Sequence, residues 1–322
     1  MPSYLNRTLP LLLACCLLAS VGSFQYSRGS FQFSRVDLAK SATPSATRLG
    51  SASVISETSI AENENIGTIK YKILQLGAAL DRGQAYNPTS GSYYSGTMAK
   101  AKALIQSLPP APPKAIEDLN GEWELVLSTV PHGIFRSSPF FLAIQEAFSF
   151  AENTTAFGED KANLFFKLHE LQTCSWGVSK VGRVAQRFDS ETGVMCSEFD
   201  TSIFSLTVIP ILGWFKLLPT FGGCVVTVSK YKLSDDMRNV EFTVDYTTSR
   251  PVEGLQGLGE WIWSVKVPVG FVWKLLPWNK GREAKGSVEH VYCDPQWRVV
   301  KDKDGEYFVY TRPVVPRALE LN

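Results

Sequence analysis

The sequence predicts a mainly β protein, an antiparallel barrel with a helical hairpin on its N-terminal side. In residues 58–108 the apolar residues recur at helical spacing, whereas after a proline-rich linker at 109–117 they follow the pattern of strands. Eight or nine such segments follow one another with no crossover helices, as in antiparallel barrels. The first opens with Gly121-x-Trp123, in which glycine permits a tight turn and tryptophan can plug one end of a barrel.

The composition of the N-terminal residues is typical of targeting segments and not of a folded domain. Residues 1–23 hold a short apolar run after Arg7, which suits a signal peptide and is too short to span a bilayer comfortably. Residues 24–57 are rich in serine and poor in acids, as in a transit peptide. This order resembles the bipartite presequence of algae with plastids of red secondary origin, so we expect a plastid protein cleaved between Ser23 and Phe24. The alternative is plain secretion followed by a disordered linker.

Residues 58–108 predict two helices. The first covers 58–80 and stops at 81–83, and the second covers about 96–108. One apolar stripe of the first helix consists of Ile66, Ile69, Ile73, Leu76 and Leu80. Because a single stripe needs a partner, we expect a hairpin packed beside the barrel and not an independent domain.

Residues 118–313 form the predicted barrel, and residues 314–322 are expected to be a tail. The strands are expected at 122–129, 183–188, 193–199, 224–233, 240–247, 287–293, 298–301 and 307–311. Residues 164–173 are an ambiguous segment for which we favour a strand. A short helix is expected at 138–148, with Ser138 as its N-cap and proline in its first turn.

Charge and cysteine content exclude some classes of protein. The chain has 32 basic and 31 acidic residues, which gives no electrostatic footprint for nucleic acid. The four cysteines beyond the N-terminal segment are widely spaced and contain no C-x-x-C pair. They are Cys174, Cys196, Cys224 and Cys293. We expect buried free thiols, with disulfides or redox control as the alternative.

The sequence offers little support for catalysis. The three histidines His132, His169 and His290 show no recurrent metal-ligand spacing, so we expect no metal site. No nucleophile elbow, phosphate-binding loop or dinucleotide fingerprint is present. Three carboxylates could be imagined as acid–base groups, although solvated carboxylates are far commoner. They are Glu146, Glu152 and Asp200.

A late arginine is a candidate partner for the tryptophan at the barrel end. Arg298 follows Asp294-Pro295-Gln296-Trp297 at the start of a late strand. We expect its guanidinium to stack on the ring of Trp123. In this interpretation Gly121, Trp123 and Arg298 close the barrel and have a structural role.

Four segments carry a family resemblance. Residues 119–125 and 135–141, with 80–83 and 294–301, resemble the plastid lipid-associated proteins, also called fibrillins. The motif residues in the second and fourth segments are Arg136, Ser137, Pro139, Phe140 and Asp294. The resemblance spans about residues 60–313 and implies a lipocalin-like barrel at thylakoids or plastoglobules. It also implies a bound lipid, carotenoid or quinone, with no catalytic cofactor and no established chemistry.

Two apolar segments share the ending aromatic-Lys-Leu-Leu-Pro. They contain Trp214, Phe215, Lys216, Leu217 and Leu218 in one case, and Trp273, Lys274, Leu275, Leu276 and Trp278 in the other. Both could cover the barrel or join its core. Alternatively they enter a membrane or lipid surface, because tryptophan prefers the interface and lysine can reach the headgroups. With two strands between them, both segments should lie at the same end of the barrel.

These observations lead to three functional hypotheses. The first is a non-enzymatic lipid- or isoprenoid-binding barrel of the plastid, peripheral to thylakoid or plastoglobule surfaces. The second is a structural or assembly partner of a thylakoid protein complex, whose apolar loops meet protein instead of lipid. The third is a lipocalin-like enzyme that acts on an apolar ligand.

Overall fold

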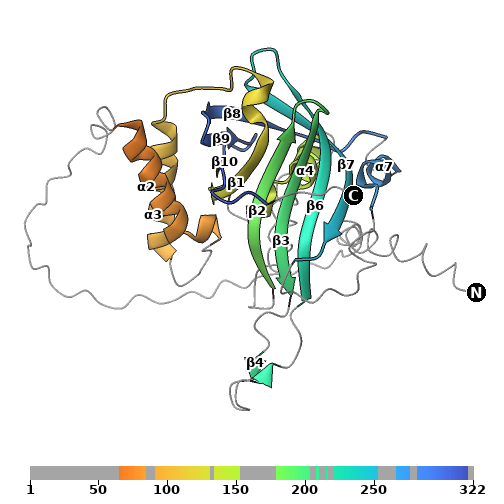
Figure 1. Ribbon diagram of the computed structural model, residues 1–322, viewed down its shortest axis with the longest axis horizontal. Helices are drawn as coiled ribbons and strands as arrows, with labels where there is room; N and C mark the ends of the chain where they lie inside the picture. Colours follow the sequence, from red (N-terminus) through yellow and green to blue (C-terminus); the bar gives the residue numbers. More distant parts are fainter. Residues whose placement is uncertain are drawn as a thin grey trace, which may run out of the picture. The chain divides into compact units, whose positions relative to one another are not determined.

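In the computed structural model, eight antiparallel strands form one sheet that closes on itself (Figure 1). The strands are β1 (Gly121–Ser128), β2 (Ser179–Asp189), β3 (Val194–Ile203), β6 (Phe221–Leu233), β7 (Asn239–Arg250), β8 (Lys285–Cys293), β9 (Trp297–Lys301) and β10 (Tyr307–Thr311). Each pairs with the next along the chain, and β10 pairs with β1 to complete the ring. The predicted mainly β class and antiparallel order are confirmed.

The structure describes residues 65–84, 91–130, 134–152, 179–203, 208–209, 215–216, 221–252, 266–275 and 281–317. The expected targeting segments and the ambiguous segment at 164–173 lie outside these ranges. A second sheet, which the sequence did not predict, pairs β4 (Val208–Ile209) with β5 (Phe215–Lys216). Within the described residues, no helix is both long enough and apolar enough to cross a membrane.

Helices α2 (Ile66–Ala79) and α3 (Gly91–Gln106) pack against each other and against outward-facing side chains of the closed sheet. Gly77 permits this contact, because a Cβ there would lie 2.5 Å from the carbonyl oxygen of Val126 on β1. Gly83, with φ +95°, follows α2 and approaches the backbone of Ser128 in the same way. The connection between the helices lies outside the described residues, so the hairpin itself stays a prediction.

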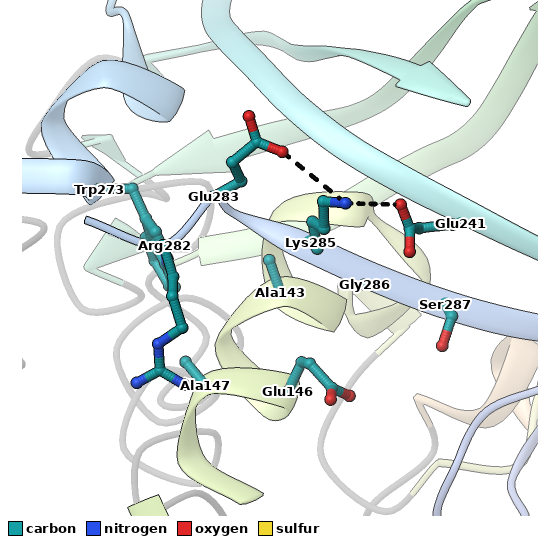
Figure 2. A pocket seen from close by; sticks show the side chains of 10 residues that line it. All are labelled: Ala143, Glu146, Ala147, Glu241, Trp273, Arg282, Glu283, Lys285, Gly286 and Ser287. Carbon is teal, nitrogen blue, oxygen red and sulfur yellow. Dashed lines mark hydrogen bonds and ion pairs between the residues drawn. The ribbon is translucent and has the colours of Figure 1, made fainter. Parts of the chain in front are cut away.

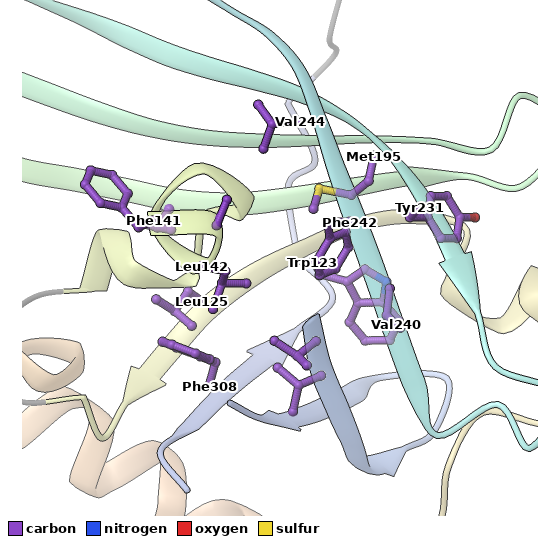
Figure 3. Close-up of a cluster of buried hydrophobic side chains, with 14 of the residues drawn as sticks. Trp123, Leu125, Phe141, Leu142, Met195, Tyr231, Val240, Phe242, Val244 and Phe308 are labelled. Atoms are coloured by element: carbon purple, nitrogen blue, oxygen red, sulfur yellow. The ribbon is translucent and has the colours of Figure 1, made fainter. Parts of the chain in front are cut away.

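Helix α4 (Pro139–Glu152) contributes to the core enclosed by the sheet. Figure 3 shows Phe141 and Leu142 of α4 in the same cluster as Trp123 and Phe242. The helix approaches β8 closely, because a Cβ on Gly286 would lie 2.6 Å from the Cβ of Leu142. The expected helix is therefore present. Its expected side-chain cap is not, because the Ser138 hydroxyl has no hydrogen-bond partner.

Candidate functional site

One end of the closed sheet is sealed by a tryptophan and an arginine. The guanidinium carbon of Arg312 lies 3.7 Å from the ring centroid of Trp123, whose Nε1 donates to the Leu119 carbonyl at 2.8 Å. Arg312 also donates to the carbonyl oxygens of Glu122 (3.3 Å) and of the 3₁₀ turn before β1. Gly121 has φ +91°, and a Cβ there would lie 3.0 Å from Arg312 Nη1. Glycine is therefore required at this position.

The prediction that Arg298 stacks on Trp123 is wrong, because Arg312 occupies that position. Arg298 lies within β9, opposite Tyr310 on β10, and its side chain is fully buried. Arg312 follows the last residue of β10 and is therefore free to turn across the end of the sheet. The sequence feature that could have predicted this contact is an arginine directly after the last strand.

Arg298 belongs to a chain of hydrogen bonds inside the sheet. Its guanidinium carbon lies 4.7 Å from the ring centroid of Phe188 and 5.0 Å from that of Tyr310. It donates to Gln186 Oε1 (2.7 Å) and to His290 Nε2 (3.1 Å). Burial lowers the pKa of Arg298, and burial together with the nearby guanidinium holds the pKa of His290 well below its ordinary value. His290 is therefore neutral at physiological pH.

The residues of the family motif have structural contacts. Arg136 is buried 3.4 Å from Asp304, and the carbonyl of Ser137 accepts a hydrogen bond from Gln186 at 2.8 Å. Pro139 begins α4. Phe140 lies edge-on to Trp273, with ring centroids 6.3 Å apart.

Asp294 fixes the turn between β8 and β9 and joins it to α2. Its carboxylate accepts from the backbone N–H groups of Gln296 (2.8 Å) and Trp297 (2.7 Å) and from the Tyr292 hydroxyl (2.8 Å). It also forms an ion pair with Lys70 of α2. The Lys70 ammonium in turn lies 4.8 Å from the ring centroid of Tyr292. These contacts indicate that Asp294, the motif residue, attaches α2 to the turn between β8 and β9.

Two of the imagined acid–base groups have ordinary contacts. Asp200 forms a two-point ion pair with Arg317, at 2.8 and 2.7 Å. Burial alone would raise the pKa of Asp200, but the hydrogen bonds and charge of Arg317 outweigh it and lower the pKa. Glu146 is exposed and lies 3.7 Å from Lys303. The side chain of Glu152 lies outside the described part.

A groove of about 370 Å³ opens between α4, β7, β8 and α7 (Val269–Leu275), as Figure 2 shows. It is lined by Ala143, Glu146, Ala147, Glu241, Trp273, Arg282, Glu283, Lys285, Gly286 and Ser287. Lys285 lies 2.8 Å from Glu241 and 3.7 Å from Glu283. The groove therefore combines paired charges with one aromatic wall from α7.

Helix α7 presents two apolar side chains to solvent. Phe271 is 63% exposed and Leu275 is 65% exposed, and their spacing of four residues places them on one side of the helix. We call this pair the α7 ridge. Lys274 is exposed and lies 3.2 Å from Glu283. Trp273 is buried against Phe140, so the prediction that it contacts lipid is wrong.

The remaining residues of the two apolar segments are only partly described. Phe215 and Lys216 form β5, and Trp214, Leu217, Leu218, Leu276 and Trp278 lie outside the described ranges. The start of β6 pairs with the end of β7, so the chain enters β6 and leaves β7 at the same end of the sheet. That both segments lie at this end stays a prediction, because most of the first lies outside the described ranges. The second segment then runs back along β7, where a Cβ on Gly270 would lie 2.4 Å from the Val244 carbonyl oxygen. This return explains why Trp273 is buried.

The thiols offer no metal or redox centre in the described part of the chain. Cys196 and Cys224 are buried and free, as predicted, whereas Cys293 is free but only half-buried and Cys174 lies outside the described residues. No group of three His, Cys, Asp or Glu side chains among the described residues could hold a metal ion. Comparisons with protein families, with curated proteins and with solved structures give no match for this chain.

Proposed function

We propose that the chain is a non-enzymatic plastid protein that binds lipids or isoprenoids and attaches peripherally to thylakoid or plastoglobule surfaces. The resemblance of its motifs to plastid lipid-associated proteins supports this assignment. So does the arrangement of one closed antiparallel sheet in which a Gly-x-Trp strand and a C-terminal arginine seal one end. Closed antiparallel sheets of eight strands can enclose an apolar ligand, as lipocalins do.

The observation that carries the membrane part of the proposal is the α7 ridge. Phe271 and Leu275 expose most of their apolar surface on a helix whose opposite side is anchored by buried Trp273. Exposed apolar groups grouped on one element are typical of surfaces that meet a membrane or another protein. Lys274 beside them is long enough to reach lipid headgroups.

The test is flotation of the full chain with galactolipid liposomes. Replacing both ridge residues, Phe271→Ser with Leu275→Ser, removes about 2–4 kcal/mol of apolar burial and should weaken vesicle affinity about 30-fold or more. The matched control is Tyr71→Ser with Tyr93→Ser, because these two side chains are equally exposed, at 61% and 67%, but belong to α2 and α3. Equal flotation of the two folded double variants would contradict the proposal.

The α7 ridge could equally bind the surface of another protein, as the assembly-partner hypothesis requires. If the ridge binds a thylakoid protein, the ridge variant should lose binding to that protein. Flotation on protein-free liposomes should then be low for wild type and for every variant. Flotation of the wild-type chain therefore separates the two. Weak dependence on salt is expected for lipid binding, because the formal net charge of the chain is +1 and apolar insertion dominates.

A further inference from the structure

The interior of the closed sheet holds the positive charge of Arg298, for which the described residues provide no counter-ion. Arg298 is fully buried, and its hydrogen bonds go to the neutral acceptors Gln186 and His290. Its Nη2 has no hydrogen-bond partner, and none of the ion pairs among the described residues includes it. Burial of an unpaired ion is strongly unfavourable, so proteins normally bury arginine together with an opposite charge.

Two buried tyrosines lie near the same guanidinium. The buried hydroxyl of Tyr231 has no hydrogen-bond partner, whereas the buried hydroxyl of Tyr310 has the Ser137 side chain beside it. Both are close enough to feel the charge of Arg298. The neighbouring acceptors are already used, because Gln186 Oε1 and His290 Nε2 both accept from Arg298. Among the described residues, Arg298 Nη2 and the Tyr231 hydroxyl are therefore two donors in this cluster that have no acceptor.

Helix α4 adds positive potential at the same place. The carbonyl of Ser137, directly before the helix, accepts from Gln186, which is itself bonded to Arg298. The helix runs for 14 residues from Pro139. Its N-terminal end therefore lies beside the Gln186–Arg298 pair, and the N-terminal end of a helix dipole attracts anions. The helix and the arginine thus favour the same kind of ligand.

We propose that the interior of the sheet binds a carboxylate at Arg298, near Tyr231 and Tyr310. A single guanidinium matches one negative charge, and its free Nη2 leaves a charge-assisted hydrogen bond to be made. The apolar walls around it include Phe188, which suits an acyl chain behind the carboxylate. Only the acyl chain of the ligand rests on the proposed lipid-binding function, because a small free carboxylate has the same anionic group.

The experiment compares an acid with its ester on the full chain. Binding of oleate and of methyl oleate is measured by titration, and melting temperature is recorded with and without acetate. The test variant is Arg298→Met, and the control is Arg238→Met, which removes one exposed arginine from the turn between β6 and β7. We expect wild type and the control to bind oleate about ten-fold or more tightly than the ester. Arg298→Met should lose this preference.

The outcomes separate the two sources of the carboxylate. A melting temperature raised by acetate in wild type but not in Arg298→Met, with no oleate preference, identifies a small free carboxylate and supports the site. An acid–ester preference that survives in Arg298→Met overturns the proposal, as does a wild type that responds to neither acid. If Arg298→Met does not fold, Tyr231→Phe with Tyr310→Phe decides, and an unchanged preference overturns it. Arg298→Met should still float with liposomes, so the site and the membrane function fail independently.

Discussion

Arg312 lies face-on over Trp123, 3.7 Å from the ring centroid, and thereby joins the end of the last strand to the start of the first. These residues are 189 positions apart along the chain (312 − 123), yet Trp123 lies in β1 and Arg312 directly follows β10, and these two strands close the ring. The contact therefore ties the closure of the sheet to two side chains. It also leaves Arg298 available for the interior.

The first prediction separates the two arginines energetically. Trp123→Ala should cost about 3–5 kcal/mol of unfolding free energy, because it leaves a large cavity. In a double-mutant cycle, Trp123→Leu and Arg312→Met should couple by about 0.5–2 kcal/mol, the size of a cation–π contact. Urea unfolding of the four proteins measures this. A larger coupling between Trp123 and Arg298 would restore the partner expected from the sequence.

The second prediction concerns the contact of α2 with β1. Gly77→Ala adds a methyl group 2.5 Å from the Val126 carbonyl oxygen and should destabilise the chain by about 1–3 kcal/mol. Gly96→Ala is the control, because a Cβ in that position of α3 meets nothing within 4 Å. It should stabilise by up to about 1 kcal/mol through helix propensity alone. Equal effects in thermal unfolding would mean that α2 does not lie against β1 in solution.

The strands were predictable from the sequence because alternation and turn residues are local signals. The segment predicted at 307–311 matches β10, and the segment predicted at 122–129 differs from β1 by one residue at each end. The positions of the functional side chains depend on longer-range geometry. Which arginine reaches Trp123 depends on how the chain leaves β10, and no local pattern encodes that.

The misassignment of Trp273 has a similar cause. An aromatic-rich run of seven residues fits a membrane surface and a covering helix equally well, because both need one apolar side. Burial of Trp273 follows from the return of the chain along β7, which brings the ring against Phe140. The α7 ridge lies on the opposite side of the same helix. The sequence prediction thus named Leu275, which is exposed, but it also named the buried Trp273 and left out the exposed Phe271.

The third prediction concerns the thiols. Burial, more than any neighbouring charge, raises the pKa of Cys196 to about 11 and that of Cys224 to about 12. Because the thiolate is the reactive form, both should be almost inert to iodoacetamide at pH 8 in the folded chain. Both should react readily in guanidinium chloride. Peptide mass spectrometry gives the labelled fraction for each, and fast labelling of folded protein would show that these strands open.

The last prediction concerns pH and the attachment of α2. Burial alone would raise the pKa of Asp294, but hydrogen bonds from Lys70, the Gln296 backbone and Tyr292 outweigh it and lower the pKa below its usual 3.8. A carboxyl group whose pKa is lower in the folded state stabilises the fold when the pH is above its pKa in the unfolded state. This stabilisation disappears as the pH falls through its pKa in the folded state. Lys70 has a raised pKa because its bonds to Asp294 and Tyr292 outweigh burial, so its contribution disappears as pH rises beyond 10.5.

Asp294→Asn should therefore cost about 1–3 kcal/mol near pH 6, through weaker hydrogen bonds and loss of the ion pair. The difference from wild type should shrink as the pH is lowered below 3.8, where the wild-type carboxylate becomes protonated. Urea unfolding from pH 3 to pH 7 measures the difference, and Lys70→Met should reduce its dependence on pH. A difference that stays constant over this range would show that Asp294 acts only through its shape and not through its charge.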